Sequence, residues 1–276
     1  MARLAPLATY RLDIEYDGTA FSGWGRQDGA HTVQGCIERA LRVTLRTPEI
    51  EVITAGRTDT GVHALGQVAS FSYDGEMPAS IVRSLNGLTP VELAIRAVTR
   101  VENSFDARRD AVSRTYCYRI LNRKPGGPFA PGRAWWISRP LDRESLDRCA
   151  KAIVGEHDFT AFTPTETYHT RFSRLVHSAR WIDEPGLGDP AAGEPLETDT
   201  LQFWITGESF LRSMVRVLVG TMVDVADGSM PFSEFEALLE GAERPAAGMT
   251  APGEGLTLVR VDYPEPPPHK LVRRAQ

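Results

Sequence analysis

Asp59 is the residue of this chain best placed for chemistry, because it lies between two glycines in a loop that apolar segments flank. Residues 50–54 read as a short strand, and residues 66–71 alternate between apolar and polar types, so the sequence predicts a strand-to-strand connection between them. An aspartate in such a loop often does no more than cap the turn with side-chain hydrogen bonds. Arg57 and His63 add two ionisable groups beside it, which is more polar chemistry than a turn requires. We therefore interpret the loop as a candidate catalytic site.

The loop and further motifs along the chain resemble the tRNA pseudouridine synthase A family. The motifs occur in the family's order and cover nearly the whole chain. They are Glu15-Tyr16-Asp17-Gly18-Thr19, Gly56-Arg57-Thr58-Asp59-x-Gly61-Val62-His63-Ala64, Ser113-Arg114-Thr115-Tyr116-x-Tyr118, Gly155-Glu156-His157-Asp158-Phe159 and Phe210-Leu211-x-x-Met214-Val215-Arg216. The chain departs from the family pattern at Gly25, Asp106, Arg109 and Arg212, positions that bear on substrate contacts rather than on the reaction.

The resemblance implies that the protein is an isomerase that converts uridine to pseudouridine in the anticodon arm of tRNA, at tRNA positions 38, 39 and 40. Asp59 would be the nucleophile, acting at the sugar C1′, at the base C6, or through a glycal intermediate. The reaction breaks the N-glycosidic bond, turns the uracil and rejoins it through carbon. It needs a positioned carboxylate, so we expect neither a metal nor another cofactor.

Arg216 is the cation that the resemblance assigns to Asp59. The sequence predicts a helix over Phe210–Val225 that is apolar almost all round, with Arg212 and Arg216 four residues apart on one face. A buried arginine requires a carboxylate partner, and the family implies an ion pair that keeps Asp59 ionised. The alternative is that both arginines form a solvated face, which we expect for Arg212.

The target base must be flipped into a pocket, and stacking on an aromatic ring offsets part of that cost. Tyr116 and Tyr118 share one strand face, and periodicity alone assigns both to the core. The resemblance selects Tyr116 as the ring that stacks on the uracil. Arg57 would fill the gap in the RNA stack or bind a flanking phosphate. We expect His63 to be a structural hydrogen-bonding residue rather than a base.

The order of predicted elements is β-α-β-β-α-β, and the second half of the chain repeats it. The sequence therefore predicts an α+β protein of two ferredoxin-like halves, and the resemblance implies a pseudouridine synthase fold with a central antiparallel sheet. We place the halves at residues 1–108 and 109–263, followed by a proline-rich tail over residues 264–276. The segment Glu184–Thr200, rich in Pro, Gly and acids, is expected to be a long hairpin loop.

Composition is that of a soluble globular protein. The net charge is −5, yet arginines concentrate between residues 96 and 148, and guanidinium groups suit phosphate binding. A biased genome composition gives the same excess of arginine. Three widely spaced cysteines, without a Cys-x-x-Cys pair, exclude a disulfide framework or structural zinc site. We expect a cytoplasmic protein with no membrane segment, acting on tRNA as a homodimer.

Two other readings remain open. Asp59-Thr60-Gly61 also occurs in aspartic proteases, which pair two such loops, whereas this chain has one. A non-catalytic RNA-binding module would also use two ferredoxin-like halves with arginines. The test that separates the readings is whether Asp59 is dispensable.

Overall fold

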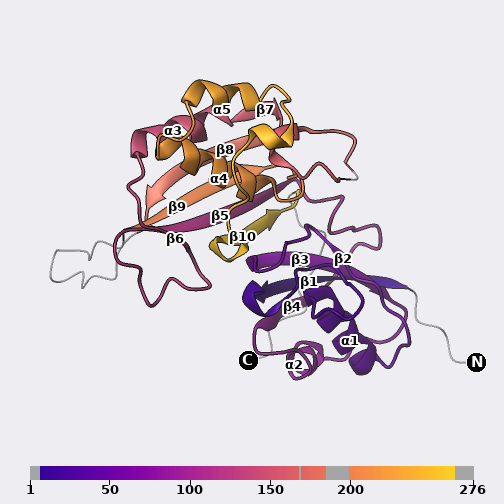
Figure 1. Cartoon of the computed structure of the whole chain (residues 1–276). Coiled ribbons are helices and arrows are strands. Elements are labelled where there is room, and N and C mark those ends of the chain that lie inside the picture. Colours follow the sequence, from indigo (N-terminus) through magenta and orange to yellow (C-terminus); the bar gives the residue numbers. More distant parts are fainter. Residues whose placement is uncertain (1–6, 168, 185–198, 265–276) are drawn as a thin grey trace, which may run out of the picture. The chain divides into compact units, whose positions relative to one another are not determined.

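A computed structural model describes residues 7–167, 169–184 and 199–264 (Figure 1). The chain divides into two compact units, one formed by the described residues of 1–112 and 258–276, the other by those of 113–257. The predicted halves, 1–108 and 109–263, stay a prediction. The units differ from them mainly because residues 258–263 lie with the first unit.

The first unit contains a mostly antiparallel sheet whose strand order is β4-β1-β3-β10, with β2 paired to β3. Strand β1 pairs antiparallel with both β3 and β4. The two helices, α1 and α2, cover one face of this sheet (Figure 1). Its elements are β1 (Ala8–Tyr16), η1 (Gly18–Ala20), α1 (Val33–Leu45), β2 (Ile53–Thr54), β3 (His63–Tyr73), α2 (Ile81–Asn86), β4 (Leu93–Val101) and β10 (Leu256–Asp262).

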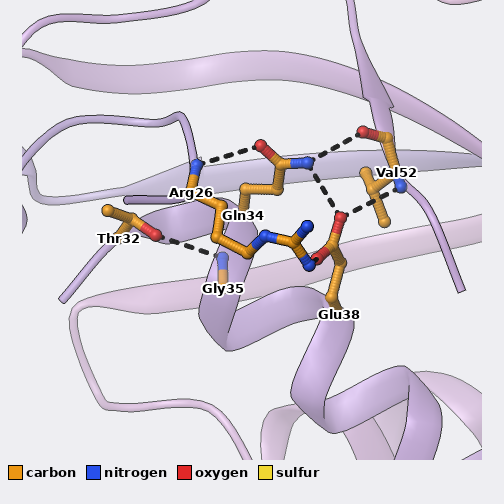
Figure 2. Close-up of polar contacts among 6 residues, drawn as sticks. All are labelled: Arg26, Thr32, Gln34, Gly35, Glu38 and Val52. Carbon is orange, nitrogen blue, oxygen red and sulfur yellow. Dashed lines mark hydrogen bonds and ion pairs between the residues drawn. The ribbon is translucent and has the colours of Figure 1, made fainter. Parts of the chain in front are cut away.

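Helix α1 begins and ends where its sequence dictates. The Thr32 side chain accepts a hydrogen bond from Gly35 N at 3.3 Å, which satisfies one of the amides left open in the first turn (Figure 2). Arg46 adopts a left-handed conformation with φ 52°, and this ends the helix. Val33, Ile37 and Leu41 recur at helical spacing and are fully buried. The Thr32 cap therefore fixes where α1 begins, directly after the segment that precedes the helix.

The second unit has the strand order β5-β9-β8-β7, all antiparallel, with β6 added parallel to β5. Helices α3, α4 and α5 pack against one another on one face of these strands (Figure 1). The elements are β5 (Ser113–Asn122), β6 (Trp135–Ile137), α3 (Arg143–Ala152), β7 (Gly155–Asp158), η2 (Thr160–Phe162), β8 (Ser173–Asp183), β9 (Thr200–Gly207), α4 (Met214–Ala226), α5 (Phe232–Leu238), η3 (Arg244–Ala246) and η4 (Gly253–Gly255).

The structure corrects the predicted start of the long helix. Helix α4 begins at Met214 and not at Phe210, because Ser213 adopts a left-handed conformation with φ 57° that is incompatible with a continuous helix. Arg212 therefore precedes the helix and is exposed. The prediction that Arg212 and Arg216 lie four apart on one helix face is wrong.

Other differences are smaller. Strand β2 covers only two residues of the strand predicted over residues 50–54, and β6, β7 and α5 were not predicted. The expected hairpin loop joins β8 to β9, which pair antiparallel, but residues 185–198 lie outside the described part of the chain, as do residues 265–276 of the predicted tail.

Candidate active site

Asp59 is held in a tight turn between β2 and β3. Val62 N donates to Asp59 O at 3.2 Å, which closes the turn, and Gly61 within it has φ 79°. That conformation favours glycine, because a β-carbon there would meet the backbone. Asp59 is half-buried. The local sequence thus fixes the backbone on both sides of the carboxylate.

A series of buried polar side chains, joined by hydrogen bonds, packs against the Asp59 loop. The Tyr16 hydroxyl lies 2.8 Å from Thr58 Oγ1, and Gln67 Nε2 donates to the Tyr16 oxygen at 3.3 Å and to Gly56 O at 2.8 Å. Burial raises the pKa of the Tyr16 phenol to about 12, partly offset by its hydrogen bonds to Thr58 and Gln67. The phenol is therefore neutral at physiological pH and holds Thr58, the neighbour of Asp59.

A second backbone segment packs against the same loop. Trp24 N donates to Thr58 O at 3.0 Å. Gly23 has φ 88°, and a β-carbon built on it would lie 2.9 Å from Thr58 O and 3.2 Å from Asp59 C. The chain approaches the Asp59 backbone this closely only because residue 23 has no side chain.

His63 is the first residue of β3 and is 5% exposed. Gly18 N donates to His63 Nδ1 at 3.1 Å, and Asp17 Oδ1 lies 3.1 Å from the same nitrogen. One nitrogen cannot accept from Gly18 and donate to Asp17 at once, so the two contacts are alternatives. Burial and the bond to the Gly18 backbone support a structural role, which stays a prediction.

Arg57 is exposed and precedes the Asp59 turn by two residues. Its Cδ would lie 3.9 Å from a β-carbon built on Gly25. The departure from the family pattern at Gly25 therefore leaves the stem of Arg57 without a neighbouring side chain at that position. Arg57, Asp59 and His63 all belong to the first unit.

Tyr116 and Tyr118 lie on β5 in the second unit, and the structure separates their environments. Tyr118 is fully buried and its hydroxyl donates to Pro252 O at 2.8 Å. Burial raises the pKa of the Tyr118 phenol, an effect that the nearby Arg216 charge partly offsets. Tyr116 is 8% exposed and packs edge-on against Phe210, with ring centroids 5.2 Å apart. Tyr118 is thus a core residue, while Tyr116 stays the candidate stacking ring.

Arg216 lies in α4 and is half-buried. Its Nε donates to Ala251 O at 2.7 Å, and Ala251 N donates to Arg216 O at 3.1 Å. These two bonds fix the guanidinium stem within the second unit. The expected ion pair between Arg216 and Asp59 stays a prediction.

Several residues that hold the loop carried no assignment from the sequence. Gln67 is a fully buried amide on the same strand face as Ala69 and Phe71, and Glu38 is a carboxylate on α1 that is 2% exposed. For Gln67 the signal in the sequence was a polar residue where the alternation requires an apolar one, whereas Glu38 gave no such signal. Among the described residues, no group of three or more His, Cys, Asp or Glu side chains is arranged to hold a metal ion.

A family model described as tRNA pseudouridine synthase matches residues 14–108 and 149–264 of this chain, which is more than half of it. The chain belongs to the tRNA pseudouridine synthase family. The matched ranges contain Asp59 and Arg216, and Tyr116 lies between them. The mixed fold with mostly antiparallel strands confirms the predicted fold class. Family membership decides against the aspartic protease alternative.

Full-length relatives agree with this assignment. A protein named tRNA pseudouridine synthase A from Leptospira biflexa is 35% identical over 271 residues, covering 97% of this chain and 98% of its own. Proteins of the same name from Rhizobium meliloti and Acetivibrio thermocellus are 36% and 38% identical, each covering 92% of this chain and 99% and 98% of their own. No helix in the described residues is long and apolar enough to cross a membrane.

Proposed function

We propose that this chain isomerises uridine to pseudouridine in the anticodon arm of tRNA, with Asp59 as the nucleophile. The observation that carries the proposal is the fixed, half-buried turn around Asp59 in a member of the tRNA pseudouridine synthase family. The backbone of the turn is hydrogen-bonded at Thr58 O and Val62 N, and Tyr16 and Gln67 bind the turn at Thr58 Oγ1 and Gly56 O. A carboxylate held in this way loses little conformational freedom when it meets its substrate.

The isomerisation breaks the bond between C1′ and N1 of the uracil and forms a bond between C1′ and C5. The C5 proton leaves and N1 gains a proton, so the product is an isomer of the substrate. Asp59 takes part as an attacking carboxylate at C1′ or C6, or as the group that assists formation of a glycal. Each route uses the carboxylate of Asp59, and the three routes differ in the intermediate that they form.

Tyr116 and Arg57 are the proposed substrate-binding residues. Tyr116 has its ring fixed by Phe210, so an inserted uracil would meet an aromatic surface that is already oriented. Arg57 is exposed beside the catalytic turn, and its guanidinium suits either a flanking phosphate or the gap that the flipped base leaves. His63 and Arg216 are proposed as supporting residues, His63 through the backbone at Gly18 and Arg216 as a cation paired with Asp59.

The proposed partner is tRNA, and we propose that the protein acts in the cytoplasm as a homodimer. The support is the family assignment and the length of a tRNA relative to a single small unit. Sedimentation equilibrium tests the assembly directly. A monomer at micromolar concentration with full activity would contradict the dimer.

The function is tested by incubating the purified protein with unmodified tRNA transcripts and mapping pseudouridine by sequencing. Transcripts with cytidine in place of uridine at tRNA positions 38 to 40 are the control. We expect modification at one or more of those positions in the first set and none in the control. Pseudouridine elsewhere would correct the site, and its absence from every tRNA would contradict the function.

A further inference from the structure

A polar network on α1 holds a segment that leads into the Asp59 loop (Figure 2). Gln34 and Glu38 are four residues apart, so their side chains are neighbours on the helix. Gln34 Nε2 donates to Glu38 Oε1 at 2.8 Å, and Val52 N donates to the same oxygen at 3.3 Å. Gln34 Nε2 also lies 3.4 Å from Val52 O. The two side chains therefore bind both polar groups of the Val52 backbone.

The same pair binds the segment that precedes α1. Arg26 N donates to Gln34 Oε1 at 3.2 Å, and Arg26 Nη1 lies 3.4 Å from Glu38 Oε2 (Figure 2). The backbone adds a bond from Gln34 N to Trp24 O at 3.0 Å. Gln34 thus contacts this segment through both its side chain and its main chain.

Both segments border the catalytic turn. Val52 immediately precedes β2, which leads into the turn, and Ala55 N, directly after β2, donates to Val68 O at 2.8 Å. On the other side, Trp24 N donates to Thr58 O at 3.0 Å. One glutamine and one glutamate therefore connect the entrance of the Asp59 loop to the segment packed against it.

We propose that Gln34 and Glu38 are positioning residues for the pseudouridine synthase reaction, because together they set the place of the Asp59 loop. The inference rests on the proposed function. Glu38 is 2% exposed, and a buried carboxylate persists only where donors surround it. Its donors come from residues 26, 34 and 52, and the amide at position 34 must accept from Arg26 N while it donates to Glu38. A carboxylate or an apolar side chain at position 34 cannot do both.

The test uses the variants Gln34→Glu and Glu38→Gln. Gln34→Glu places two carboxylates side by side without a donor between them, so we expect kcat to fall at least about ten-fold, while KM for tRNA changes less than about three-fold. In Glu38→Gln the amide oxygen at position 38 can still accept from Gln34 Nε2 and Val52 N, and only the contact with Arg26 Nη1 is lost. We expect the kcat of Glu38→Gln to stay within a few-fold of the wild type.

Asn86→Ala is the matched control, because Asn86 makes a comparable clamp elsewhere in the same unit. Its Nδ2 donates to Ile95 O at 2.9 Å and its Oδ1 accepts from Ile95 N at 2.8 Å, which joins α2 to β4. We expect this variant to lose stability but to keep its kcat per folded molecule. Equal loss of kcat in Asn86→Ala and Gln34→Glu, a wild-type kcat in Gln34→Glu, or a loss in Glu38→Gln as large as in Gln34→Glu would overturn the proposal.

Hydrogen exchange separates failure of this inference from failure of the function. We expect the amides of residues 55–62 to exchange at least about ten-fold faster in Gln34→Glu than in the wild type, and unchanged in Asn86→Ala. Unchanged exchange in Gln34→Glu would overturn the positioning role whatever the activity. A wild-type protein that forms no pseudouridine would contradict the proposed function, and the exchange rates would still decide whether the network holds the loop.

Discussion

Replacing Gly23 by alanine perturbs the Asp59 loop from outside it. Gly23 has φ 88°, and its added β-carbon would lie 2.9 Å from Thr58 O and 3.2 Å from both Asp59 C and Thr60 N. All of these are backbone atoms, so no flexible side chain can move out of the way. The matched control is Gly29→Ala, because Gly29 has φ 72° but a β-carbon there would have no atom within 4 Å.

The two variants share the cost of a left-handed alanine, which is ~1–2 kcal/mol. Gly23→Ala adds an overpacking cost of ~1–3 kcal/mol. We therefore expect the free energy of unfolding to fall by ~1–2 kcal/mol in Gly29→Ala and by ~2–5 kcal/mol in Gly23→Ala. The clash is relieved if the Asp59 loop shifts by a few tenths of an ångström. Because a misplacement of about 1 Å can slow catalysis about 100-fold, we expect kcat to fall about ten-fold or more in Gly23→Ala alone.

Denaturant unfolding followed by circular dichroism gives the two stabilities, and single-turnover formation of pseudouridine gives the rates. The comparison is made below the midpoint of unfolding, so that both variants are folded. Equal stability losses in the two variants, with wild-type turnover in Gly23→Ala, would show that the Asp59 loop does not depend on the close approach of residue 23.

Two further outcomes follow from single contacts. Tyr16→Phe removes the hydroxyl between Thr58 and Gln67 and should lower the free energy of unfolding by ~0.5–1.5 kcal/mol near neutral pH. Because the folded-state pKa of Tyr16, about 12, exceeds its ordinary value of 10.0, its contribution is complete below pH 10 and is lost as pH rises toward 12. Stability measured across that range should fall less steeply in Tyr16→Phe, and an identical slope would contradict the buried phenol. Arg216→Met should lower both stability and turnover, since it removes the hydrogen bond to Ala251 O. Arg212→Met changes an exposed residue outside α4 and should keep wild-type turnover. Equal effects of the two variants on stability and pseudouridine formation would contradict the different roles of Arg216 and Arg212.

The regular elements could be predicted because each shows one clear period. The apolar spacing of Val33, Ile37 and Leu41 is that of one helix face and indicates α1, and the glycines around Asp59 indicate its turn. The start of α4 could not be predicted, since residues 210–213 continue an apolar helical pattern and only the conformation of Ser213 stops it. Strand β7 was also missed, because Gly155–Asp158 is polar and is formed by pairing with β8 rather than by its own pattern.

The supports of the candidate site were harder to predict than its central residue. Asp59 was selected by its loop and by the family resemblance. Gln67 and Glu38 act through contacts with residues distant in sequence, such as Gly56 and Val52, and those contacts exist only once the strands and α1 are assembled. The sequence shows Gln67 at an apolar position of its strand, but it does not show which residues Gln67 and Glu38 bind.

The most direct test of Asp59 as the nucleophile is Asp59→Asn, which keeps the shape of the side chain and removes its charge. Pseudouridine formation and tRNA affinity are measured on the same preparation, with the wild type alongside. We expect no detectable pseudouridine and a Kd for tRNA within a few-fold of the wild type, because phosphate contacts dominate binding. Turnover comparable to the wild type in Asp59→Asn would contradict the nucleophile assignment.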